Sequence, residues 1–226
     1  MPRSSAFKGG GAAAGTASSA ATAAIATLLG MAVSLFVRHN GRCMAESLRG
    51  KLLLASPTLL DPNFVRTVVL IAEHTEDGAM GLVLNRPAAS SVAEAVPDLA
   101  WLTGDEEQVY VGGPVAETAV IVLAEFDRPE AAGALVEGDL GFVGTDADDP
   151  GALDGAIRRA RVFAGHAGWG PGQLEGELED EAWIVEPPRR EEIFTEDAAG
   201  LWAAVLRRKG RRYALLSTMP LDPSLN

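Results

Sequence analysis

A glycine-rich corner is encoded by Ala167-Gly168-Trp169-Gly170-Pro171-Gly172-Gln173-Leu174-Glu175-Gly176-Glu177-Leu178. The first six of these residues include three glycines, a proline and a tryptophan. Glycine permits positive φ and close backbone approach, and proline fixes φ near the value that a first helical turn needs. The pattern therefore predicts a stiff loop that leads into a short helix over 173–180, with Trp169 as the large side chain at the corner.

Three further glycine- and proline-containing motifs precede this corner. They read GKLLLASP at 50–57 with DPNF at 61–64, GAMGLVLNRP at 78–87, and YVGGPV at 110–115. In this order, across about 48–186, the motifs resemble the signature of the YqgE/AlgH family. The resemblance implies a compact cytoplasmic α+β domain without an established chemical activity. Some members have been described as transcriptional regulators, but the family carries no recognised DNA-binding motif.

Charge is distributed unevenly along the 226 residues. Residues 1–43 contain no Asp or Glu and four basic residues, whereas all 31 acidic residues and the other 15 basic residues lie in 44–226. The net charge of 44–226 is therefore −16. Because such a body is repelled by phosphate backbones, we expect no direct binding to nucleic acid. The charge fits a soluble protein, or one whose partner is basic.

The first 43 residues also differ in composition. Residues 9–24 are rich in Gly, Ala, Ser and Thr without periodicity, which is typical of a segment that does not order itself. Residues 20–37 form an uncharged stretch of 18 residues, the lower limit for a membrane span. The single cysteine, Cys43, closes this region and excludes an internal disulfide or a thiolate metal cluster.

Three interpretations of 1–43 are open. The segment is a membrane anchor, a cleaved targeting segment, or sequence upstream of the true start. We prefer a start at Met44, because the composition changes there and the family resemblance begins just after it. The expectation is thus a cytoplasmic protein, with membrane attachment through 20–37 as the alternative.

Apolar runs and turn residues predict the elements of 44–226. The predicted strands are 51–55, 67–72, 80–84, 109–111, 118–124, 142–143, 183–185 and 213–216, of which the second and third form a hairpin around 74–78. The predicted helices are 91–97 behind an S-x-x-E capping box, a helix from Asp149-Pro150 that includes Leu153 and Ile157, then 173–180 and 198–208.

Hairpins and short helices alternate here without βαβ regularity. No period of 20–50 residues repeats, and no internal linker is evident. The sequence therefore predicts an α+β fold, with a mixed, curved β-sheet flanked by short helices in one compact domain over 44–226. A non-globular segment, 1–43, precedes it.

The end of one predicted strand supplies the first candidate site. Arg86, beside the Asn85 amide, could clamp a carboxylate or phosphate bidentately. Alternatively, Arg86 forms a structural ion pair in an acidic protein and Asn85 caps a turn. Gly112 and Gly113 could present backbone N–H groups to an anion, although a plain tight turn is the favoured explanation.

The glycine-rich corner supplies the second candidate group, Trp169, Gln173 and Glu175. Trp169 is either a stacking surface or a packed corner residue. We hypothesise that this loop faces the turn at Asn85 and Arg86 to form one ligand-binding site. Arg86 would supply the positive charge and Trp169 the apolar wall. Asn85 and Gln173 would orient a polar ligand.

Motifs for common cofactors and catalytic devices are not found in the sequence. It contains no G-x-G-x-x-G, no G-x-x-x-x-G-K-[ST] and no G-x-S-x-G. The histidines, His39, His74 and His166, lack the spacing of metal ligands, so we expect neither a metal site nor a cofactor. His74 begins a predicted turn and is expected to be exposed.

Two classes of function remain. The first is a noncatalytic regulatory or adaptor protein that binds a small ligand or a protein partner, with any effect on transcription being indirect. The second is a small enzyme with an unrecognised site around Asn85, Arg86, Trp169, Gln173 and Glu175. The first is favoured, because no nucleophile, metal set or phosphate loop is evident.

Overall fold

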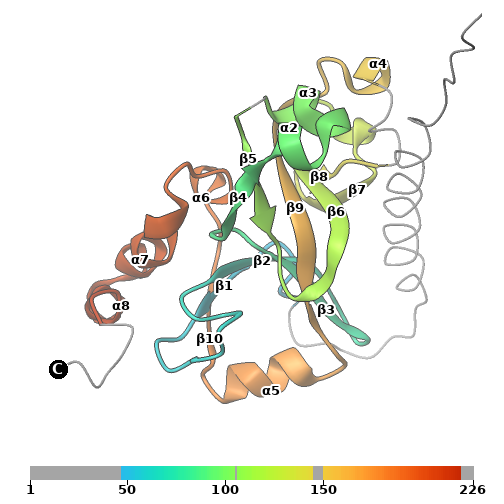
Figure 1. Cartoon of the computed structure of the whole chain (residues 1–226). Coiled ribbons are helices and arrows are strands. Elements are labelled where there is room, and N and C mark those ends of the chain that lie inside the picture. The colour runs from blue at the N-terminus through green and yellow to red at the C-terminus, as the bar shows by residue number, and fades with distance from the viewer. Residues whose placement is uncertain (1–46, 105, 145–149, 220–226) are drawn as a thin grey trace, which may run out of the picture.

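The computed structural model describes residues 47–104, 106–144 and 150–219 (Figure 1). The predictions for 1–43 and the predicted helix cap Asp149 lie outside these residues. Within the described ranges, no helix is both long enough and apolar enough to cross a membrane.

A ten-stranded sheet forms the centre of the fold. Its strands are β1 (Leu52–Ala55), β2 (Val68–Thr75), β3 (Gly78–Val83), β4 (Pro87–Ser91), β5 (Gln108–Val111), β6 (Val115–Phe126), β7 (Ala134–Glu137), β8 (Leu140–Phe142), β9 (Ile157–Trp169) and β10 (Trp183–Glu186). The order is β10-β1-β2-β3-β9-β6-β8-β7, and β4 pairs with β5, which also pairs with β9. The β5–β9 pair is parallel and the other pairs are antiparallel, so the predicted mixed sheet of an α+β fold is confirmed.

Short helices flank the sheet (Figure 1). They are α2 (Val92–Ala95), η1 (Pro97–Leu99), α3 (Ala100–Thr103), η2 (Pro129–Ala131), α4 (Pro150–Leu153), α5 (Gln173–Glu179), α6 (Arg190–Ile193), α7 (Ala198–Lys209) and α8 (Arg211–Leu216). The capping box before α2 is confirmed: the Glu94 N–H donates to the Ser91 hydroxyl, and the Ser91 N–H donates to the Glu94 carboxylate.

Strand β9 holds the two parts of the sheet together. One of its edges pairs with β6 along most of its length. Its other edge pairs first with β5, at Phe163 and Ala164, and then with β3, at 167–169. A single strand of 13 residues therefore connects β3 and the strands beyond it to β5, β6 and β8.

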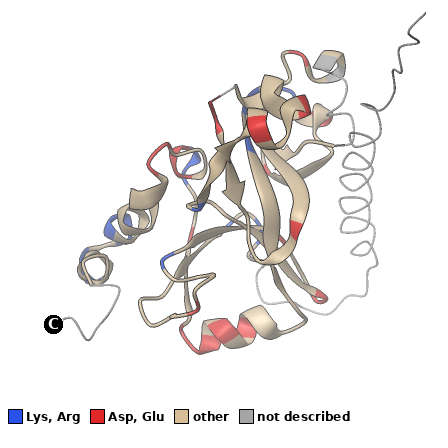
Figure 2. Cartoon of the chain, viewed as in Figure 1, with Lys and Arg blue, Asp and Glu red and all other residues tan. Residues whose placement is uncertain are grey.

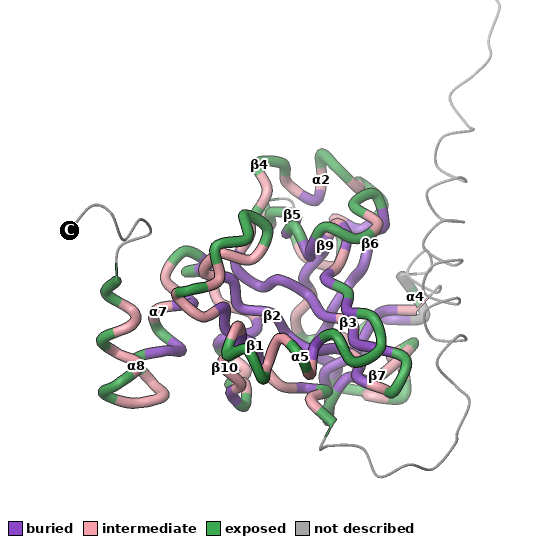
Figure 3. The backbone as a smooth tube through the Cα atoms, turned by 90° about the horizontal axis from the view of Figure 1, so that it is seen from below, coloured by how far each residue is buried: buried purple, intermediate pink, exposed green. Residues whose placement is uncertain are grey.

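The continuous apolar runs of β1 and β2 are explained by burial on both faces, since successive side chains of a strand point to opposite sides. One face packs against Trp202 and Val205 of α7 and comprises Leu52, Leu54, Val68 and Leu70. The other packs against Trp169, Leu174 and Trp183 and comprises Leu53, Val69 and Ile71. Figure 3 shows both strands as buried backbone between the exposed loops.

Three predicted elements are wrong. Residues 213–216 belong to helix α8, because Tyr213 and Leu216, three residues apart, both pack on the core. Ile157 does not continue the helix at Leu153 but opens β9, after a backbone turn at Gly155 with φ +61°. The predicted loop at the glycine-rich corner is also shorter, because β9 continues through Trp169.

Candidate functional site

The connection between β5 and β6 crosses β9 at Gly165. A Cβ on Gly112 would lie 2.2 Å from the Gly165 carbonyl oxygen, and one on Gly113 would lie 2.3 Å from the Ala167 nitrogen. The Gly112 N–H donates to the Ala164 carbonyl oxygen at 2.8 Å. The paired glycines therefore allow two backbone segments to touch, and the Gly112 N–H is not available to an anion.

The loop over 61–66 lies between β1 and β2 and forms a hydrogen-bonded turn of its own. The N–H groups of Phe64 and Val65 both donate to the Asp61 carbonyl oxygen, at 2.9 and 2.7 Å. Arg66 then adopts a φ of +54°, which is uncommon for a residue with a side chain. Such a conformation persists when neighbouring contacts hold it.

Asn85 and Arg86 supply some of those contacts. The Asn85 amide nitrogen donates to the Arg66 carbonyl oxygen at 2.9 Å, and its amide oxygen accepts from the Val68 N–H at 3.0 Å. Arg86 donates to the Val65 carbonyl oxygen at 2.7 Å. Asn85 is 8% exposed and uses both ends of its amide internally, so its role is to hold the loop against the start of β2.

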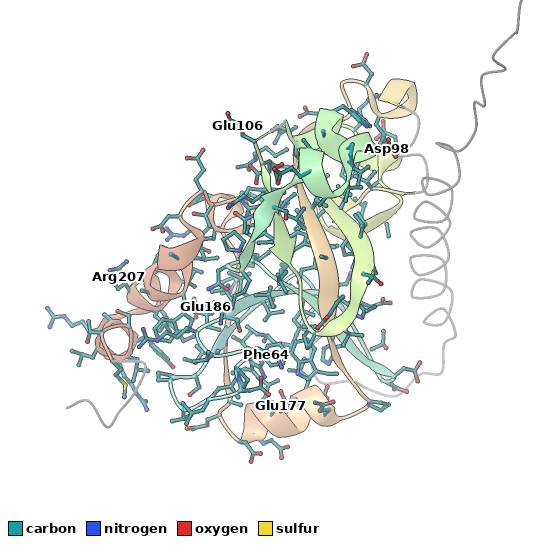
Figure 4. All side chains as sticks on the ribbon, viewed as in Figure 1. Phe64, Asp98, Glu106, Glu177, Glu186 and Arg207 are labelled. Atoms are coloured by element: carbon teal, nitrogen blue, oxygen red, sulfur yellow. The ribbon has the colours of Figure 1, made fainter. Side chains whose placement is uncertain are left out.

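Phe64 holds the other side of the same loop. Its ring stacks on Trp169 with centroids 6.2 Å apart and meets Trp183 edge-on at 5.5 Å. The two indoles meet edge-on at 5.9 Å. In Figure 4, Phe64 lies between the sheet and α5, close to Glu177. Trp169 is 6% exposed and acts as a packing anchor for the 61–66 loop.

The carboxylate of Glu177 on α5 accepts hydrogen bonds from the polar groups of this aromatic cluster. One carboxylate oxygen accepts from the indole N–H of Trp169 at 2.9 Å and from that of Trp183 at 2.7 Å. The other accepts from the Gln173 amide at 2.8 Å, and Gln173 in turn accepts from the Gly170 N–H. Trp169 and Gln173 are thus committed to internal hydrogen bonds.

Glu175 is bound to His74, which is buried rather than exposed as the sequence suggested. The Leu48 N–H donates to His74 Nδ1 at 3.0 Å, which assigns the ring proton to Nε2. Nε2 then donates to the Glu175 carboxylate at 2.7 Å. Burial acts to raise the pKa of Glu175, but hydrogen bonds from its own backbone and from His74 outweigh this effect and lower that pKa.

Two open hollows meet at Arg86. The first, which we name the Trp202 hollow, has a volume of about 480 Å³ and is lined by 65–66 and 85–87 on one side and by Ala199, Trp202, Ala203 and Ser217 on the other. The second, of about 250 Å³, is lined by 62–63, Val83, Arg86, Pro87, Val111, 113–114 and Glu117. Arg86 and Gly113 thus share the second hollow.

Among its described lining residues, the Trp202 hollow has two guanidinium groups and no acidic side chain. Arg66 lies over the Trp202 ring, 5.1 Å from its centroid, and donates to the Met219 carbonyl oxygen. Among the described residues, neither Arg66 nor Arg86 forms an ion pair. The structural ion pair that the sequence offered as an alternative for Arg86 is therefore not present in this part of the chain.

The two candidate groups are not brought into one pocket. Trp169, Gln173 and Glu175 line neither hollow at Arg86. Instead, both groups hold the 61–66 loop from different sides, through Phe64 on one and through the carbonyl oxygens of Val65 and Arg66 on the other. The aromatic ring that lines a hollow together with Arg86 is that of Trp202 and not that of Trp169.

Sequence reasoning missed Arg66 and Trp202. Arg66 stands two residues after the DPNF motif at 61–64, which served only for the resemblance, and Trp202 lies within the predicted helix 198–208. Their proximity depends on a contact between α7 and the 61–66 loop, which no spacing in the sequence encodes. Within the described ranges, no group of three or more His, Cys, Asp or Glu side chains is arranged to hold a metal ion.

Comparison with known proteins identifies relatives of this chain. The sequence matches the AlgH-like family over residues 52–214. A UPF0301 protein of Streptomyces coelicolor is 40% identical, covering 83% of this chain and 100% of its own. One of Mycobacterium tuberculosis is 41% identical, covering 78% and 90%. These names state no activity.

Two solved structures are similar in fold. The crystal structure of a Corynebacterium diphtheriae protein superposes with a TM-score of 0.70 at 27% identity, covering 79% of this chain and 95% of that one. The solution structure of the AlgH protein from Pseudomonas aeruginosa gives a TM-score of 0.61 at 30% identity, covering 80% and 98%.

Proposed function

This chain belongs to the AlgH-like family, and we propose that it is a noncatalytic binding protein of the regulatory or adaptor kind. The ligand is a small anion with a short apolar part, or an equivalent acidic side chain of a partner. Arg66 and Arg86 bind the anionic group in the Trp202 hollow.

One observation carries this proposal. Two guanidinium groups line a hollow whose described lining residues include no carboxylate, in a chain with 31 acidic and 19 basic residues. Where acidic residues are in such excess, arginines that form no ion pair among the described residues are available to an external anion. Guanidinium groups match carboxylate and phosphate geometry and form charge-assisted hydrogen bonds with them.

The rest of the lining suggests the apolar part of the ligand. Ala199 and Ala203 are small residues on α7 that leave space beside the Trp202 ring. The volume of about 480 Å³ falls within the range of small-molecule sites. The lining residues that the structure describes include no histidine or cysteine, and their one hydroxyl, that of Ser217, donates to the Ala214 carbonyl oxygen. These features support binding rather than catalysis.

The same proposal places the protein in the cytoplasm. Any effect on transcription would then pass through a protein partner, since the charge of −16 on 44–226 opposes direct contact with DNA. Salt-dependent retardation of duplex DNA by purified protein, at micromolar concentration, would contradict this part of the proposal.

Titration with hexanoate and hexanamide tests the proposal, since the two probes share an apolar chain and differ in charge. The readout is the indole N–H resonance of Trp202, assigned with the Trp202→Phe variant. This N–H donates to the Ala55 carbonyl oxygen at 2.8 Å, so its resonance is a sensitive reporter at the wall of the hollow. We expect hexanoate to shift it at millimolar concentration and hexanamide to leave it unchanged.

Arginine variants test which positive charge binds hexanoate. Arg86→Ala should abolish the hexanoate shift while the melting temperature stays close to that of the parent protein. Arg128→Ala removes an exposed arginine whose hydrogen bond is to Asp154, on another part of the fold, and should leave the shift intact. Equal responses to the two probes, or an unchanged hexanoate response in Arg86→Ala, would rule out this site.

A further inference from the structure

Helix α8 exposes an apolar side chain on its outer face. Tyr213 and Leu216 pack inward against the core. Leu215 is 73% exposed and shares the outer face with Arg211 and Arg212, which lie four and three residues before it. A leucine at this exposure, beside two exposed arginines, does not contribute to the packing of the described residues.

Basic residues also lie at the C-terminal end of α7, which adjoins α8. The helix begins with Asp197, whose carboxylate caps it, and ends with Arg207, Arg208 and Lys209. Arg208 is ion-paired with Glu186 and Glu192, and Lys209 is ion-paired with Glu186. Figure 2 shows the resulting segregation, with Lys and Arg on α7 and α8 and with Asp and Glu along α5.

Three further arginines lie at the end of α7 and the start of α8. Within the described ranges, Arg207, Arg211 and Arg212 form no ion pair. All three are exposed, and Figure 4 shows Arg207 projecting away from the rest of the molecule. Together with Leu215 they form what we name the α8 surface.

We propose that the α8 surface binds the headgroup layer of an anionic lipid membrane. Arginines contact lipid phosphates, and each basic residue near an anionic surface contributes favourably to binding. Leu215 enters the boundary between headgroups and acyl chains, as apolar residues of interfacial helices do. Nucleic acid would account for the arginines but not for the exposed leucine.

The charge of the rest of the protein determines which part of the fold faces the membrane in this proposal. The net charge of −16 on 44–226 is repelled by an anionic surface, and the acidic residues Glu179, Asp180 and Glu181 lie on and just after α5. The α8 surface is therefore the part of the fold that approaches the membrane. Binding of this kind is reversible and decreases as salt screens the charges.

Cosedimentation of the full chain with vesicles tests the proposal. We use phosphatidylcholine alone and phosphatidylcholine mixed with one quarter of phosphatidylglycerol. The protein should bind the mixed vesicles and lose binding as salt is added. Arg211→Gln and Arg212→Gln should each weaken binding roughly fivefold. Leu215→Ser should also weaken it without lowering the melting temperature, because the side chain is exposed.

Arg128→Gln is the matched control, since it removes one exposed positive charge elsewhere and should leave vesicle binding unchanged. Any contribution of 1–43 is common to all variants and cancels in the comparison. Mixed-vesicle binding that is identical in parent, Arg211→Gln and Arg212→Gln would overturn the proposal. Absence of vesicle binding, with retardation of duplex DNA that depends on these arginines, would assign the surface to nucleic acid instead.

Discussion

Gly112 lies so close to Gly165 that a Cβ on the first would stand 2.2 Å from the carbonyl oxygen of the second. In return, a Cβ on Gly165, whose φ is +70°, would lie 2.7 Å from the Gly113 carbonyl oxygen. The crossing of the β5–β6 connection over β9 thus depends on the absence of side chains from both segments.

Substitution of Gly112 by alanine should therefore destabilise the fold, by about 1–3 kcal/mol as in other overpacked sites. The matched control is Gly176→Ala in α5, where a Cβ would meet nothing within 4 Å. That change should stabilise the protein by about 0.5–1 kcal/mol, since alanine is the better helix former. Urea unfolding of both variants measures the difference, and equal effects of the two changes would argue against the crossing.

Glu177→Ala should lower stability by about 3 kcal/mol. The substitution leaves the indole N–H groups of Trp169 and Trp183 without an acceptor in a buried cluster, and an unsatisfied buried donor costs about 1–3 kcal/mol. Glu179→Ala, on the exposed side of the same helix, should change stability by less than about 0.5 kcal/mol. Thermal unfolding followed by tryptophan fluorescence distinguishes the two.

Asn85→Ala and Arg86→Ala should separate stability from binding. Asn85 is buried and satisfies the Val68 N–H and the Arg66 carbonyl oxygen, so its loss should cost about 2 kcal/mol. Arg86 is only partly buried, and its substitution by alanine removes a single hydrogen bond, to the Val65 carbonyl oxygen. Its loss should cost about 1 kcal/mol or less. If Arg86→Ala unfolded as readily as Asn85→Ala, Arg86 would be a structural residue.

His166 should make stability depend on pH near neutrality. Burial lowers the pKa of His166, and its Nδ1 has no hydrogen-bond partner in the part of the chain that the structure describes. As pH falls below the ordinary value of about 6.5, the unfolded chain takes up a proton that the folded protein takes up only at lower pH. Stability should thus decrease from pH 7.5 to 5.5, by at most about 1.4 kcal/mol per pH unit.

The variant His166→Phe tests that assignment. It should lack this component of the pH dependence, as measured by urea unfolding at pH 7.5, 6.5 and 5.5. The lowered pKa of Glu175 acts in a separate window, because its contribution is lost only as pH falls below about 4.5. A pH profile that is the same in parent and His166→Phe would show that another group titrates.

A protein that begins at Met44 should melt cooperatively at the temperature of the full chain. The family match begins at residue 52 and the change in charge lies at residue 44, so residues 1–43 are expected to add nothing to the core. Differential scanning calorimetry compares the two proteins. Aggregation of the shorter protein, or a much lower melting temperature, would show that 1–43 packs on the domain.

Local signals in the sequence predicted much of the fold. The hairpin of β2 and β3 follows from a β-branched run, a turn and a second apolar run, and the cap of α2 follows from Ser91 and Glu94. Helices α5 and α7 follow from their spacing of apolar residues. In each case, the residues that determine the element are neighbours in the sequence.

The errors arose where distant residues decide. Ile157 belongs to a strand because it pairs with Phe126 of β6. Tyr213 belongs to a helix because it packs against the core on the same side as Leu216. The candidate site depends on distant contacts too. Arg86 was identified from its motif, but the aromatic ring beside it in the hollow, that of Trp202, lies on α7, far along the chain.

The position of β9 in the chain has a consequence for synthesis on the ribosome. Its partners β3, β5 and β6 are all made before it, and none of them can complete its pairing until residues 157–169 have emerged. The edge of β1 that does not pair with β2 likewise stays unpaired until β10 has been made, about 130 residues later. The nascent chain therefore carries unpaired strand edges through most of its translation. Since such edges invite aggregation, this protein should depend on holding chaperones until its last strands are made.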